Sequence, residues 1–133
     1  MESQTDIPGN QTLRRNVRLL AAMTVVLAGT GLYVLGAQAF AVGLFPSPWD
    51  KLAHVVTFAG MGGAFGLATG KRGWSRAFSC IAGALMIGVM DEWHQAYLPG
   101  RTASWSDLMA DAAGGTLAAA ALSWRHWLMQ RRI

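Results

Sequence analysis

The stretch FSCIAGALMIGVMDEWHQAYLPGR, residues 78–101, joins an apolar run to a dense group of polar residues. The apolar run ends at Met90, and Asp91 and Glu92 follow it directly. Gln95 lies one helical turn after Asp91, so these two side chains share a helix face. Burying two acids at the end of an apolar helix costs free energy. The rest of the chain is therefore expected to bring polar partners to these acids.

The composition indicates an integral membrane protein. Of the 133 residues, 53% are hydrophobic and only 14% are charged, whereas soluble proteins carry about 25% charged residues. A soluble domain this short would have too much surface for so few charges to cover. The formal charge is +4, but the basic residues cluster beside apolar runs, which favours membrane topology signals over nucleic-acid binding.

The hydrophobic pattern predicts an all-α bundle of four transmembrane helices. The polar residues 1–13 are expected to form a disordered tail, and residues 14–133 a single domain. Ser47 and Ser104 are expected to cap the second and fourth helices. A cleaved signal peptide is the alternative for the first apolar run, but this run is longer than the ~7–15 residues of a signal core. The four helices are expected at residues 19–40, 48–69, 75–98 and 104–124.

The charges predict which end of the bundle faces outward. The chain has 11 Lys and Arg residues, and all except Lys51 and Arg101 fall at one end of the predicted bundle. The positive-inside rule makes that end cytoplasmic, together with both termini. Of the seven acids, five lie at the other, extracytoplasmic end. These five acids are Asp50, Asp91, Glu92, Asp107 and Asp111.

Glycines mark the helix faces that are expected to pack closely. Gly62, Gly66 and Gly70 repeat every four residues, and Asp107, Asp111, Gly114, Gly115 and Ala118 share one face of the fourth helix. Structural roles are therefore assigned to Gly62, Gly66, Gly114 and Gly115.

Four motifs resemble the VanZ-like family of bacterial membrane proteins, which is named for a protein linked to teicoplanin resistance. They are Asp50-Lys51-x-x-His54, Asp91-Glu92-x-x-Gln95, Pro99-Gly100-Arg101 and Asp107-x-x-x-Asp111-x-x-Gly114, and the similarity extends from Trp49 to Ala120. Two positions depart from the family pattern, because position 111 is often Asn and position 58 is often Tyr. The resemblance implies a multi-pass protein of the bacterial cytoplasmic membrane that acts in the cell envelope.

The first functional hypothesis is an extracytoplasmic site that handles an anionic envelope lipid or contributes to glycopeptide resistance. Lys51, Gln95 and Arg101 would bind the substrate, because Arg makes two-pronged contacts with phosphate. His54, oriented by Asp50, and the acids Asp91 and Glu92 would be the catalytic groups. A divalent cation held by carboxylates is a variant of this site. Its candidate ligands are Asp91, Glu92, Asp107 and Asp111.

The second hypothesis is a non-catalytic interaction or structural protein. Its polar cluster would only hold the helices together, with Asp50 and Asp107 as helix caps. The sequence contains no nucleophile motif, so the question of catalysis stays open. Ion transport is disfavoured because the inner halves of the helices are almost entirely apolar. Outward helix faces leave room for a homodimer beside the lipid bilayer.

Overall fold

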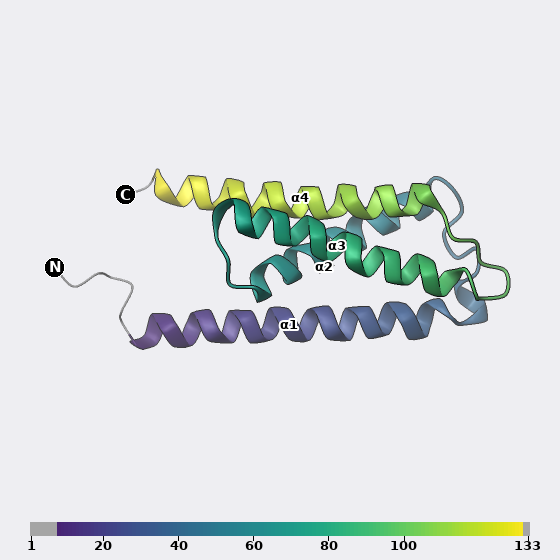
Figure 1. The fold of residues 1–133 in the computed structure, drawn as a ribbon, viewed down its shortest axis with the longest axis horizontal. Coiled ribbons are helices and arrows are strands. Elements are labelled where there is room, and N and C mark those ends of the chain that lie inside the picture. Colours follow the sequence, from purple (N-terminus) through teal and green to yellow (C-terminus); the bar gives the residue numbers. More distant parts are fainter. Residues whose placement is uncertain (1–7, 132–133) are drawn as a thin grey trace.

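The computed structural model describes residues 8–131 and shows four α-helices. The helices are α1 (Pro8–Gly36), α2 (Trp49–Ala68), α3 (Gly73–Gln95) and α4 (Trp105–Gln130), and the 3-10 turn η1 (Ala39–Ala41) follows α1. Figure 1 shows α1 running along one side of the molecule, with α2, α3 and α4 beside it. The predicted all-α class with four helices is confirmed.

The first helix differs most from its predicted bounds. α1 begins at Pro8, so residues 8–13 are helical and do not belong to a disordered tail. Proline suits the first turn of a helix, and Arg14 Nε donates a 3.2 Å hydrogen bond to Asn10 Oδ1 in this segment. Residues 1–7 of the predicted tail lie outside the described part of the chain. The helix ends at Gly36, four residues before the end of the apolar run.

The caps of α2 and α4 differ in how they match the prediction. Ser104 caps α4, and its hydroxyl accepts a hydrogen bond from the Ser106 amide at 3.2 Å, as predicted. The prediction for Ser47 was wrong, because α2 begins at Trp49 and Pro48 occupies the cap position without a side-chain bond. Gly70 does not belong to the packing face of Gly62 and Gly66, since it follows the end of α2 with a φ of +66°, a conformation that favours glycine.

The polarity of the bundle is inverted relative to a soluble protein. Large apolar side chains are exposed along all four helices, for example Leu27 at 67% and Phe78 at 71%. The acids Asp91 and Asp111, by contrast, are only 6% and 0% exposed. α1 and α3 are long and apolar enough to cross a membrane. This arrangement suits a lipid environment, where apolar side chains face outward and charges face the bundle interior.

Glycines allow α2, α3 and α4 to pack against one another with close backbone approach. A Cβ atom on Gly62 of α2 would lie 2.7 Å from the Cys80 carbonyl oxygen of α3. A Cβ on Gly114 of α4 would lie 2.5 Å from the Val55 carbonyl oxygen of α2, and one on Gly115 would lie 2.7 Å from the Ala84 Cβ. This packing leaves no room for larger side chains and fixes how the three helices are rotated about their axes.

Candidate functional site

A cavity of about 340 Å³ opens at the end of the bundle where α1 ends and α2 begins. Its walls come from α1, the connection that contains η1, α2, the end of α3 and the turn before α4. Its polar and charged lining consists mainly of Asp50, His54, Asp91, Gln95, Arg101 and Asp107. Each of the four motifs therefore contributes at least one residue to this cavity, and the fourth contributes Asp107.

His54 pairs with a carboxylate of another helix. Its Nδ1 atom lies 2.8 Å from Asp111 Oδ1, and the Asp111 side chain is fully buried. The sequence had assigned the orienting role to Asp50, one turn before His54, and the structure corrects this to Asp111. The ring of His54 also stacks on that of Phe58, with centroids 5.8 Å apart. These contacts fix the imidazole and leave Nε2 as the ring nitrogen for a further partner.

Lys51 bridges two acids at the rim of the cavity. Its ammonium lies 2.9 Å from Asp50 Oδ2 and forms a second, short ion pair with Asp107. The Asp107 side chain is 12% exposed and that of Lys51 is 34% exposed, so this bridge is partly shielded from water. Lys51 is therefore neutralised by carboxylates and is less suited to bind phosphate than the sequence suggested.

The adjacent acids Asp91 and Glu92 have different partners. Asp91 accepts a 2.7 Å hydrogen bond from Gln95 Nε2 within α3. Glu92 reaches the start of α4, where Oε2 accepts a 2.5 Å hydrogen bond from the Ser104 amide. In a capping box this acceptor would come from the third helical residue, Asp107. Because Glu92 takes that role, Asp107 is left to pair with Lys51.

Arg101 has no carboxylate partner among the described residues. It donates a 3.1 Å hydrogen bond from Nη2 to the Gly36 carbonyl oxygen at the end of α1. Its Nε is buried and has no hydrogen-bond partner in the described structure. Arg101 thus lines the cavity and keeps one donor, Nε, without a partner among the described residues.

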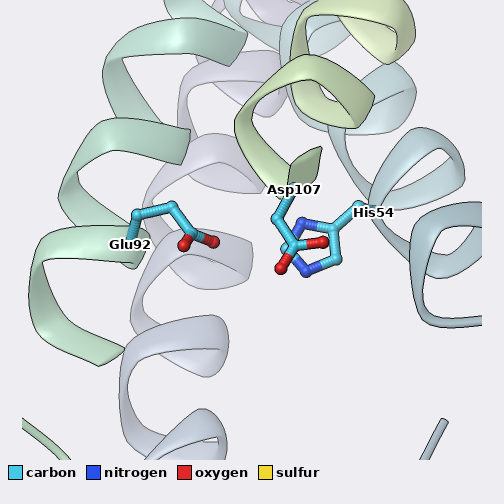
Figure 2. A group of neighbouring side chains, drawn as sticks. All are labelled: His54, Glu92 and Asp107. Carbon is cyan, nitrogen blue, oxygen red and sulfur yellow. The ribbon is translucent and has the colours of Figure 1, made fainter. Parts of the chain in front are cut away.

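Three side chains from three helices converge beside the cavity (Figure 2). His54, Glu92 and Asp107 each offer one atom suited to a metal ion, and these atoms all lie within 4.8 Å of one another. The predicted ligand set was Asp91, Glu92, Asp107 and Asp111. The observed group keeps Glu92 and Asp107 and adds His54, whereas Asp91 bonds to Gln95 and Asp111 to His54.

Sequence reasoning missed two contributions to the site. The Gly36 carbonyl oxygen binds Arg101, but no side-chain pattern marks a backbone acceptor. Gly88, one turn before Glu92, lies against the Asp111 carboxylate so closely that a Cβ there would collide with it. The sequence signal for Gly88 was its i, i+4 spacing to Glu92, which places both residues on the face of α3 that meets the site. His94 stacks on Tyr33 of α1 with ring centroids 3.7 Å apart, as a structural histidine would.

A family model described as VanZ/LLP1 matches residues 4–127 of the chain. The matched segment contains all four helices up to the last turns of α4, together with every residue of the cavity. No curated protein and no solved structure matches the chain.

Proposed function

The chain belongs to the VanZ/LLP1 family, and from this premise we propose that it binds the head group of an anionic envelope lipid. The cavity at the end of the bundle is the binding site, and Arg101 holds the phosphate of the head group. The observation that carries this proposal is Arg101, which lines the cavity and has a buried Nε without a hydrogen-bond partner and no paired carboxylate among the described residues. Arg suits such a role because its fixed, planar donors match phosphate oxygens.

The proposal includes four membrane crossings in the bacterial cytoplasmic membrane, with the cavity on the extracytoplasmic side. The basic residues support this orientation. Five arginines line a second cavity of about 470 Å³ at the opposite end of the bundle. They are Arg14, Arg18, Arg72, Arg76 and Arg125. Basic residues gather on the cytoplasmic side of membrane proteins, which supports an extracytoplasmic position for the Arg101 cavity.

Cysteine labelling tests this orientation. In a Cys80→Ala background, Ser47→Cys and Ala103→Cys should react with a membrane-impermeant maleimide in intact cells. Ser75→Cys, in the exposed first turn of α3, should react only after permeabilisation. The reverse pattern of labelling would place the cavity in the cytoplasm and end the proposal of an envelope lipid.

A lipid-binding measurement tests the role of Arg101. We expect the purified wild-type protein to retain phosphatidylglycerol from mixed vesicles in preference to phosphatidylcholine, as read by native mass spectrometry. In Arg101→Ala, the fraction of protein that retains one anionic lipid should fall to a small part of the wild-type value. Arg101→Lys should restore little of this fraction because a single ammonium cannot replace the planar donors. The melting temperature should fall only slightly, since one hydrogen bond contributes about 1 kcal/mol.

The arginine-rich inner cavity makes a matched control necessary. Arg72→Ala removes an arginine from that cavity and leaves the Arg101 cavity intact. The loss of the anionic lipid bound in the Arg101 cavity should therefore appear with Arg101→Ala and be absent with Arg72→Ala. Equal lipid retention by wild type and Arg101→Ala would refute the assignment of the phosphate to Arg101.

A contribution to glycopeptide resistance follows from the same site. A protein that sequesters or modifies anionic lipids of the outer leaflet changes the surface that a glycopeptide such as teicoplanin meets. The His54–Asp111 pair at 2.8 Å is the feature that favours catalysis, because a carboxylate-oriented imidazole is suited to proton transfer. The cavity, which His54 lines, would bring the head group to this imidazole.

The second candidate is a structural role for the polar cluster. The contact of Glu92 with the Ser104 amide and the ion pair of Lys51 with Asp107 favour this role, because they link α3 to the start of α4 and α2 to α4. In that case Arg101→Ala and Arg101→Lys would leave both lipid retention and drug sensitivity unchanged. Loss of function would then appear only in variants that also lose thermal stability.

A further inference from the structure

Among the described residues, two carboxylates have a buried oxygen without a hydrogen-bond partner, Asp111 behind His54 and Glu92. Glu92 is the one beside His54 and Asp107. The residue is 8% exposed, and its Oε1 atom is buried without a hydrogen-bond partner in the described structure. A buried carboxylate with an unused oxygen is costly in a protein interior, and more so in a membrane. Its carboxylate points toward Asp107 and His54 (Figure 2). A cation between these three side chains would neutralise Glu92 and use the free oxygen.

His54 is prepared to act as a metal ligand. The hydrogen bond between Nδ1 and Asp111 leaves Nε2 as the coordinating atom and holds the ring in place. A carboxylate behind a histidine is the usual support for a metal-bound imidazole, since it fixes the tautomer and raises the basicity of the ligand. Asp111 is fully buried and therefore belongs to this support rather than to the cavity wall.

Asp107 completes the set without losing its ion pair. Lys51 contacts Oδ1 of Asp107 and also has Asp50 as a partner at 2.9 Å. The second oxygen of Asp107 is thus available to an ion. Ligand atoms at about 2.1 Å from one zinc ion lie roughly 3.4 Å from each other. One candidate ligand atom from each of the three side chains lies within 4.8 Å of the other two. Such atoms need to approach by little more than about an ångström to reach the spacing around one ion.

We propose that His54, Glu92 and Asp107 bind one divalent transition-metal ion, Zn²⁺ or Mn²⁺, with Asp111 as the positioning residue of His54. One imidazole and two carboxylates suit these ions, whereas Mg²⁺ and Ca²⁺ prefer oxygen ligands alone. Three protein ligands leave at least one coordination position open. His54 and Asp107 also line the Arg101 cavity, so this position is accessible from it. The ion site shares His54 and Asp107 with the cavity, but it does not depend on Arg101, the residue that carries the lipid proposal.

The test is ion binding to the full-length protein in detergent after treatment with a chelator. We expect one Mn²⁺ per chain by electron paramagnetic resonance, displaced by Zn²⁺. Glu92→Gln keeps the oxygen that accepts the Ser104 amide bond and should abolish the bound Mn²⁺ signal. Asp111→Asn should weaken binding roughly 10- to 100-fold through His54. His54→Gln and Asp107→Asn should weaken it at least as much.

Matched controls exist for each type of ligand. Asp91→Asn changes a buried acid beside Glu92 that already bonds to Gln95, and His94→Asn changes a histidine that stacks on Tyr33. Both variants should keep one Mn²⁺ with an unchanged dissociation constant. Circular dichroism without metal should show that Glu92→Gln is folded. If Asp107→Asn does not fold, the Mn²⁺ binding of Glu92→Gln alone tests the proposal. Absence of stoichiometric binding, or equal loss in Asp91→Asn and Glu92→Gln, would overturn the proposal.

Discussion

Gly114→Leu is expected to abolish the folded bundle. A Cβ at position 114 would lie 2.5 Å from the Val55 carbonyl oxygen and 2.7 Å from the Ala59 amide nitrogen of α2. Both atoms belong to the backbone of a helix and cannot rotate away as a side chain would. Overpacking a tight core costs about 1–3 kcal/mol, and a leucine against rigid backbone is expected at or above the upper end of that range. The measurement is the yield of monodisperse protein and its melting temperature in detergent.

The control for Gly114→Leu is Gly60→Leu in α2. Within the described part of the chain, no atom lies within 4 Å of a Cβ placed at Gly60. Leucine also has a higher helix propensity than glycine by roughly 0.8 kcal/mol. Gly60→Leu should therefore keep or raise the melting temperature. A Gly114→Leu variant as stable as wild type would show that α2 and α4 do not approach each other as closely as the structure describes.

Lys51→Met should destabilise the bundle by roughly 2 kcal/mol. The substitution removes the shared cation of Asp50 and Asp107 and leaves the Asp107 carboxylate in a nearly buried position without its ion-pair partner. Removing one member of a fully buried ion pair costs about 3–5 kcal/mol, and the partial exposure of Lys51 lowers that figure. The lost stability should be visible as a lower melting temperature at pH 7.

A double-mutant cycle separates the ion pair from the shape of the site. In Lys51→Met/Asp107→Asn the unpaired charge is gone, so the double variant should be more stable than Lys51→Met alone. This comparison measures how much the ion pair between Lys51 and Asp107 contributes to the stability of the contact between α2 and α4. If Lys51→Met had no effect on stability in either background, the structural role of the cluster would be refuted at this position.

The number of helices and the position of the polar end were accessible from sequence. Apolar runs of spanning length and the clustered acids required four helices whose charged ends meet. The start of α1 was not accessible, because polar residues such as Asn10 and Gln11 extend a helix only when the following apolar turns already support it. The C-terminal end of α4 was not predicted for the same reason, since the helix continues past Trp124 to Gln130.

The pairing within the site was only partly accessible. Helical spacing correctly placed Gln95 beside Asp91, because both lie on one helix. The partners of His54, Glu92 and Lys51 come from other helices or from a backbone amide. These contacts depend on how α2, α3 and α4 are rotated about their axes. That rotation is set by close backbone approach at residues such as Gly114. The glycine pattern marked Gly114 as a close-packing position, but it did not show which backbone atoms of α2 this residue meets.

Close packing at the glycines of α3 and α4 also determines the side from which the proposed ion site would exchange its ion. Directly beneath Asp111, Gly88 lies against its carboxylate, and Gly114 and Gly115 bring the backbones of α2 and α3 against α4. Cys80 and Ala84, both fully buried, fill the next layer. Such a layer leaves no passage for a hydrated ion, so an ion at the proposed site would be loaded and released only from the cavity side. A chelator that does not cross the bilayer should therefore strip an ion from reconstituted protein when the cavity faces it, and should fail when the cavity faces the vesicle lumen.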